Sequence, residues 1–155
     1  MVASTSNLDI QEKNLPETLV AGIRARGSYQ ETGIRMGKLA RAAGRLMSGP
    51  PMTLYYEPEF KEQDADFETC VPVKQEVKKE GIQVHRLEGG RCIVLLHRGP
   101  YAELSRSYQK VFEYMRERKL EPKLPCREVY IKGPGMIFRG NPKNYLTEIQ
   151  IPVAE

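Results

Sequence analysis

The sequence predicts an α+β domain in which a strand-helix-strand-strand unit occurs twice. Three observations support this fold class: an internal repeat, short apolar runs that alternate with two amphipathic helical patterns, and glycine- and proline-rich breaks between them. The repeats cover about residues 15–74 and 87–155. The chain has 155 residues, of which 40% are hydrophobic and 28% charged, as in an ordinary single globular domain.

The repeat is clearest where a strand is expected to lead into a helix. The motif Arg-Gly-x-Tyr-x-Glu occurs at Arg26–Glu31 and again at Arg98–Glu103. The ends of the two halves also match, because Glu68–Val73 and Glu148–Val153 share the pattern Glu-x-x-x-Pro-Val. A duplicated unit that buries its own apolar face against its copy is the expected architecture.

Two helices are predicted, one in each half, over about Gln30–Met47 and Ala102–Arg118. Each carries an apolar stripe at helical spacing. The stripes comprise Met36, Leu39, Ala40, Ala43, Leu46 and Met47 in the first helix, and Leu104, Tyr108, Val111, Phe112 and Met115 in the second. Prolines at positions 50, 51, 122 and 125 end both patterns.

Seven runs of apolar or alternating residues predict strands. They are Val20–Ala25, Met52–Glu57, Ala65–Val73, Gly81–Leu87, Cys92–His97, Arg127–Lys132 and Tyr145–Val153. Gly89 and Gly90 predict a hairpin turn between the fourth and fifth of these. An antiparallel sheet with both helices on one face would bury the two stripes, and a ligand groove is then expected between the halves.

Composition argues against several other classes of protein. No apolar run is long enough for a membrane helix, and the N-terminus lacks a signal-peptide pattern, so a cytoplasmic location without membrane contact is expected. Residues 1–7 are expected to be a loose tail before a domain at residues 8–155. The net charge is +4, but its basic residues are scattered without a binding motif, so no direct nucleic-acid binding is expected.

The cysteines and histidines do not form a metal-ligand pattern. Cys70, Cys92 and Cys126 are far apart and odd in number, which favours buried, reduced thiols. His85 and His97 lack ligand spacing with any cysteine or acid. No metal and no cofactor are therefore predicted.

The candidate site is selected by the two-residue period of strands. Glu128 and Tyr130 share one face of their strand, and the repeat superposes them on Thr53 and Tyr55. Two tyrosines and one carboxylate are thus expected to come together. Further tyrosines expected nearby are Tyr101, Tyr145 and Tyr56, the last because a one-residue shift of register exchanges it with Tyr55.

Such a set suits a cationic ligand, since aromatic faces attract cations and a carboxylate supplies the counter-charge. The alternative is that Glu128 is an exposed strand residue and that the tyrosines only pack. For Glu68 and Glu148, in matched strands, a surface position is favoured. For Tyr29 and Tyr101, at the turns into the helices, a role as aromatic caps on the core is favoured.

The segments Arg98–Tyr101, Glu128–Pro134 and Thr147–Val153 together resemble the gyrase-inhibitor-like (GyrI-like) small-molecule-binding domain. The same domain forms the effector-binding half of some multidrug-sensing transcription activators. The resemblance covers roughly Leu15–Val153. Because only a short segment precedes Leu8, the chain resembles the stand-alone members.

The resemblance implies a tandem fold with a ligand pocket, in which Glu128 pairs with lipophilic cations and aromatic residues stack on them. By position, the aromatic candidates are Tyr55, Tyr101, Tyr130 and Tyr145. Sequestration or sensing of a drug or toxin is the leading interpretation. One alternative is hydrolysis of strained, cyclopropane-bearing electrophilic toxins, with Glu128 and Tyr130 as catalytic residues. The other is an interaction module that contacts gyrase or another regulator.

Overall fold

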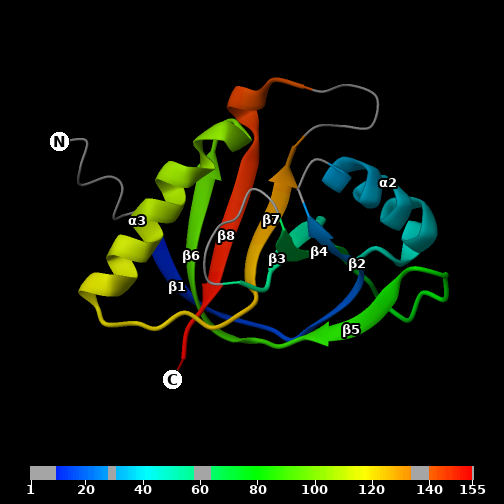
Figure 1. The fold of residues 1–155 in the computed structure, drawn as a ribbon, viewed down its shortest axis with the longest axis horizontal. Helices are drawn as coiled ribbons and strands as arrows, with labels where there is room; N and C mark the ends of the chain where they lie inside the picture. Colours follow the sequence, from blue (N-terminus) through cyan, green and yellow to red (C-terminus); the bar gives the residue numbers. More distant parts are fainter. Residues whose placement is uncertain (1–9, 28–30, 58–63, 134–139, 155) are drawn as a thin grey trace. The chain divides into compact units, whose positions relative to one another are not determined.

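The computed structural model of the chain describes residues 10–27, 31–57, 64–133 and 140–154 (Figure 1). The tail predicted at residues 1–7 and the predicted cap Tyr29 lie outside this part. The chain divides into two compact units, one of residues 16–89 and one of residues 90–155 together with the segment that ends at Leu15. None of the helices in the described residues has the length and apolar character needed to cross a bilayer.

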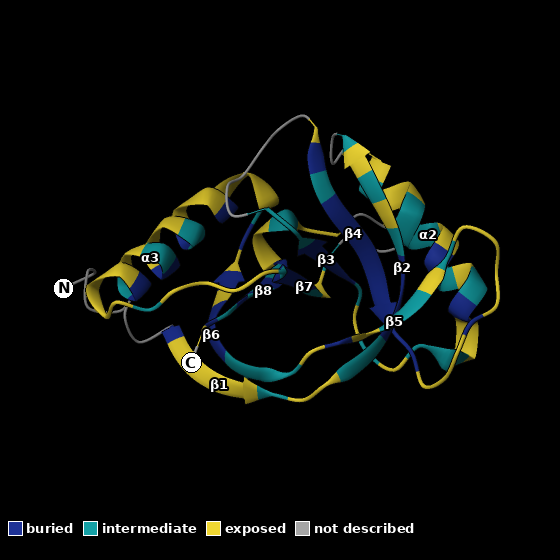
Figure 2. Ribbon diagram, turned by 60° about the horizontal axis from the view of Figure 1, so that its bottom comes forward, coloured by how far each residue is buried: buried dark blue, intermediate teal, exposed yellow. Residues whose placement is uncertain are grey.

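The unit of residues 16–89 is a four-stranded antiparallel sheet with one helix. Its strands lie in the order β3-β4-β2-β5. Its elements are β2 (Thr18–Gly27), α2 (Thr32–Ala43), a 3-10 turn (Gly44–Leu46), β3 (Met52–Tyr55), β4 (Ala65–Pro72) and β5 (Gln83–Leu87). The central strand β4 is almost entirely buried (Figure 2).

Helix α2 covers one face of this sheet. Leu39 and Ala43 are buried against Ala21 of β2 and Val71 of β4. The helix ends at Gly44, whose φ of +51° is readily adopted only by glycine, and whose N–H bonds to the carbonyl of Ala40. The predicted last turn of the helix is therefore a separate 3-10 turn.

The other unit repeats this architecture. Its strands lie in the order β1-β6-β8-β7, again antiparallel. Its elements are β1 (Ile10–Leu15), β6 (Gly90–Arg98), a 3-10 turn (Tyr101–Glu103), α3 (Leu104–Glu117), β7 (Cys126–Lys132), a 3-10 turn (Pro142–Asn144) and β8 (Leu146–Pro152). In chain order β2, α2, β3 and β4 correspond to β6, α3, β7 and β8, so the predicted α+β duplication is confirmed.

Helix α3 lies alongside β6 in this unit (Figure 1). Its buried residues Leu104, Val111 and Met115 belong to the predicted stripe, while Tyr108 and Phe112 are half-buried at its margin. Ser107 is also buried. Its polar hydroxyl is tolerated there because it is hydrogen-bonded to the ring of His97 of β6.

The hairpin predicted at Gly89 and Gly90 is wrong. Strand β5 pairs with β2, where Leu87 lies opposite Thr18, and β6 pairs with β1, where Gly90 lies opposite Leu15. Strand β1, which precedes the first repeat, therefore pairs with β6, the first strand of the second repeat. Strand β5, which precedes the second repeat, pairs with β2, the first strand of the first repeat. Strand β1 was not predicted, because four of its six residues are exposed and it lacks alternation.

Candidate functional site

Glu128 and Tyr130 lie on β7, on the side of the sheet that faces α3. In the register of the sheet, Tyr130 pairs with Thr147 of β8, which in turn pairs with His97 of β6. The ring of His97 is 2.7 Å (Nδ1 to Oγ) from Ser107 of α3. Because paired residues of antiparallel strands point to the same face, Tyr130 and Glu128 also face the helix.

Both oxygens of the Glu128 carboxylate accept a hydrogen bond from a tyrosine. Tyr130 donates from its hydroxyl to Oε1 over 2.8 Å, and Tyr108 of α3 donates to Oε2. The residue is only 6% exposed, so the exposed-strand alternative for Glu128 is wrong. A carboxylate at this depth needs such donors, since an unsatisfied buried charge is costly.

The two phenols stabilise the carboxylate without cancelling its charge. Burial, reinforced by the neighbouring charge of Glu128 and the hydrogen bond to it, raises the pKa of Tyr108 well above its ordinary value. The proton therefore stays on Tyr108, which acts as a neutral donor. An ionised Glu128 at this place would lie under a helix, in surroundings where electrostatic attraction is stronger than in water.

Three tyrosine rings extend from this carboxylate. The ring of Tyr101 meets that of Tyr130 edge-on, with centroids 5.7 Å apart, and that of Tyr145 at 5.2 Å. Tyr145 is buried, whereas Tyr101 is 38% exposed. Burial of the rest of the ring raises the pKa of Tyr101 to about 12, with further contributions from Tyr145 and Glu128.

The backbone at Gly133 leaves room for Tyr101. A Cβ atom at this position would lie 2.5 Å from the hydroxyl oxygen of Tyr101. A side chain here would therefore push the tyrosine out of its place. Sequence reasoning gave no role to this glycine.

Tyr55 and Tyr56 point to opposite faces of the other unit. Tyr55 pairs with Phe67 of β4, and the guanidinium of Arg35 from α2 lies 5.4 Å from the centre of the Phe67 ring, so Tyr55 faces the helix. The hydroxyl of Tyr56 instead donates to Glu68, on the face away from α2. Each of Tyr55 and Tyr130 thus faces the helix of its own unit. Their meeting at Glu128, and the groove between the halves, stay predictions.

Tyr108 is the site residue that sequence reasoning missed. The helical pattern places it on the apolar stripe of the second helix. A tyrosine on the inward side of a helix must find a partner for its hydroxyl, and this requirement is the signal that could have indicated a polar group beneath it. The partner, on a strand 20 residues away, comes from tertiary packing.

The surface position favoured for Glu68 is wrong. Glu68 is 3% exposed and accepts hydrogen bonds from Tyr56 and His85. Its repeat counterpart Glu148 is half-buried and accepts a hydrogen bond of 2.8 Å from the side-chain amide of Gln150. A short strand pattern does not reveal that both faces of β4 are covered.

Cys70, Cys92 and Cys126 are free and buried, as predicted. Burial raises the pKa of Cys126 to about 11, although the positive charge of Arg127 opposes the shift. In the described part of the chain, no three histidine, cysteine or acidic side chains are grouped as metal ligands would be.

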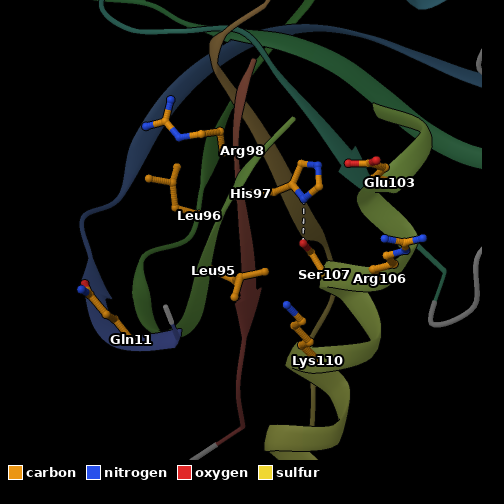
Figure 3. Close-up of a pocket in the computed structure, with 9 residues that line it drawn as sticks. All are labelled: Gln11, Leu95, Leu96, His97, Arg98, Glu103, Arg106, Ser107 and Lys110. Atoms are coloured by element: carbon orange, nitrogen blue, oxygen red, sulfur yellow. Dashed lines mark hydrogen bonds between the residues drawn. The ribbon is translucent and has the colours of Figure 1, made fainter. Parts of the chain in front are cut away.

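A cavity of about 610 Å³ beside β6 contains none of the predicted site residues (Figure 3). Its basic lining residues Arg98, Arg106 and Lys110 do not converge, because Arg98 points to the side of β6 opposite His97, whereas the other two come from α3. The carboxylate and rings around Glu128 make the stronger candidate site.

The chain matches the family model of the GyrI-like small molecule binding domain over residues 8–154. Its structure is similar to that of the C-terminal domain of EcmrR, with 25% sequence identity, a TM-score of 0.81, and coverage of 94% of this chain and 97% of that one. In a second structure, an EcmrR–DNA complex, the match has 23% identity and a TM-score of 0.80 and spans only 57% of the EcmrR chain.

Two other structures share the fold at lower identity. A hydrolase from Listeria innocua is 15% identical with a TM-score of 0.69, covering 94% of this chain and 92% of that one. SAV2435 bound to tetraphenylphosphonium is 17% identical with a TM-score of 0.62, covering 94% and 93%. No curated protein sequence matches the chain significantly.

Proposed function

The chain belongs to the GyrI-like small-molecule-binding domain family, and from this premise we propose that it binds lipophilic cations at Glu128. The observation that carries the proposal is the buried carboxylate held by two neutral phenols. Hydrogen bonds from two phenols favour the ionised carboxylate, and an ionised carboxylate attracts a nearby cation but not an uncharged ligand.

The tyrosines support a lipophilic rather than a strongly hydrated cation. Tyr101 exposes part of its ring and packs against Tyr130, which itself contacts Glu128. A ligand on this ring would meet an aromatic face and a carboxylate together, and cation–π attraction adds to the charge interaction. Tetraphenylphosphonium, the ligand of SAV2435, has this chemistry.

The test is calorimetric titration with tetraphenylphosphonium and with neutral triphenylphosphine oxide. We expect micromolar binding of the cation, weakened by about 1–3 kcal/mol, or roughly 5- to 150-fold, in Glu128→Gln. Binding of the neutral probe should not depend on this substitution. Glu113→Gln, on the exposed side of α3, removes the same charge and should leave both affinities unchanged.

Equal affinities of wild type and Glu128→Gln for the cation would refute the assigned site. The hydrolase alternative uses the same carboxylate and predicts that product exceeds one equivalent per protein. In the interaction-module alternative, binding to a partner protein would be unaffected by Glu128→Gln.

A further inference from the structure

A second buried carboxylate lies in the unit of residues 16–89. Glu68 of β4 is 3% exposed and points away from α2. The hydroxyl of Tyr56 donates to its Oε1 over 2.7 Å, and Nε2 of His85 lies 2.9 Å and 2.8 Å from its two oxygens. An acid, an imidazole and a phenol thus meet outside the Glu128 site.

The cluster depends on a glycine in the strand between its members. Strand β2 separates β4, which carries Glu68, from β5, which carries His85. A Cβ atom on Gly22 of β2 would lie 2.0 Å from Oε2 of Glu68. The carboxylate reaches His85 by passing over Gly22, where no side chain blocks it.

The hydrogen-bond pattern fixes which nitrogen of His85 carries the proton. An ionised carboxylate only accepts hydrogen bonds, so Nε2 carries the hydrogen that faces Glu68. The lone pair of the neutral ring is then on Nδ1. The His85 side chain is 36% exposed, and its Nδ1 is neither buried nor hydrogen-bonded to another described residue. A basic nitrogen is therefore presented to solvent.

The side chain of Tyr56 is also held in place by its neighbours. The guanidinium of Arg24 lies 3.9 Å from the centre of the Tyr56 ring and is held by Asp66, with hydrogen bonds of 2.9 Å and 2.8 Å. Burial and the hydrogen bond to Glu68 raise the pKa of Tyr56, so the phenol remains a donor to the carboxylate. Arg24 and Tyr56 thereby orient Glu68, which orients His85.

We propose that Tyr56, Glu68 and His85 form a second chemical site, in which His85 is a general base for hydrolysis of small activated carboxylic esters. Nδ1 takes a proton from water as the water oxygen attacks the carbonyl carbon. The tetrahedral intermediate then expels the alkoxide or phenoxide, which leaves with that proton. Because Nδ1 is flanked by Cβ, proton transfer is sterically easier than direct attack on carbon. This inference is independent of the function proposed for Glu128.

The test uses p-nitrophenyl acetate as the probe. The protein-dependent rate of nitrophenol release should fall about tenfold or more in His85→Gln. Gln83→Ala, an exposed change on the same strand, is the matched control and should keep the wild-type rate. Glu68 and Tyr56 are positioning residues, so their role needs a readout other than rate.

Nitrogen-15 spectra of the ring supply that readout, because the chain has only two histidines. We expect the neutral ring of His85 to carry its hydrogen on Nε2 in the wild type, and to populate both tautomers in Glu68→Gln. An unchanged esterase rate in His85→Gln, or a wild-type ring with its hydrogen on Nδ1, would overturn the proposal. The spectrum decides even if a Glu68 variant fails to fold.

Discussion

The hydroxyl of Tyr130 lies 2.8 Å from the carboxylate of Glu128, two residues earlier on the same strand. Residues two apart on a strand share a face, so this contact follows directly from the strand geometry. The second contact, from Tyr108, adds a donor from the helix that covers the strand. Together they connect β7 to α3 through a buried polar group.

Removing the donor on α3 should destabilise the unit. In Tyr108→Phe, the buried Glu128 loses one of its two phenol donors, and we expect the free energy of unfolding to fall by about 1–3 kcal/mol. Urea denaturation measures this. Tyr114→Phe on the same helix, where the hydroxyl has no hydrogen bond to a described residue, should change stability by less than about 0.5 kcal/mol. Equal effects of the two substitutions would argue against the contact.

Gly22→Ala should be strongly destabilising, because its Cβ would overlap the carboxylate of Glu68. We expect a loss of about 1–3 kcal/mol in thermal or urea unfolding. Gly33→Ala is the control, since a Cβ in that part of α2 meets nothing within 4 Å. Combining Gly22→Ala with Glu68→Ala removes the overlap, so the double variant should lose less than the sum of the two single changes.

The tyrosines should titrate in two groups as the pH rises. The pKa of Tyr101 is raised to about 12, and those of Tyr56 and Tyr108 are raised too, so these three should stay protonated when ordinary tyrosines ionise near ~10. Absorbance at 295 nm should therefore show fewer than the eight tyrosines of the chain ionised at pH 11. All eight should ionise together in urea.

The same shifts make stability depend on pH. The unfolded chain loses these protons near ~10, while the folded protein retains them to higher pH, so the folded state binds more protons in between. Stability contributed by the neutral phenols is complete below about pH 10 and is lost as the pH rises through 12. Constant stability across this range would contradict the assignment.

The three thiols should be protected in the folded protein. All are buried, and burial raises the pKa of Cys126 to about 11 and also that of Cys92. Ellman's reagent requires an accessible thiolate, so native protein should react slowly and denatured protein should release three equivalents. Rapid reaction of one thiol in native buffer would show that this cysteine is exposed.

Patterns with a local period were predictable from the sequence. The duplicated order of elements, the two helical stripes and the shared face of Glu128 and Tyr130 all follow from the repeat and from periods of 3.6 and two residues. The prediction of a hairpin at Gly89 and Gly90 was wrong, because two glycines between apolar runs allow a turn but do not specify which strands pair.

The fold class and the family resemblance could be predicted from the order of short local patterns along the chain, and Glu128 and Tyr130 could be paired because they lie two residues apart on one strand. Tertiary structure alone decided that Tyr108 completes the Glu128 site, and that Glu68 passes over Gly22 to reach His85. The two hydrogen bonds join residues 20 and 17 positions apart on separate elements. Their partners depend on strand order and helix placement, which no local period encodes.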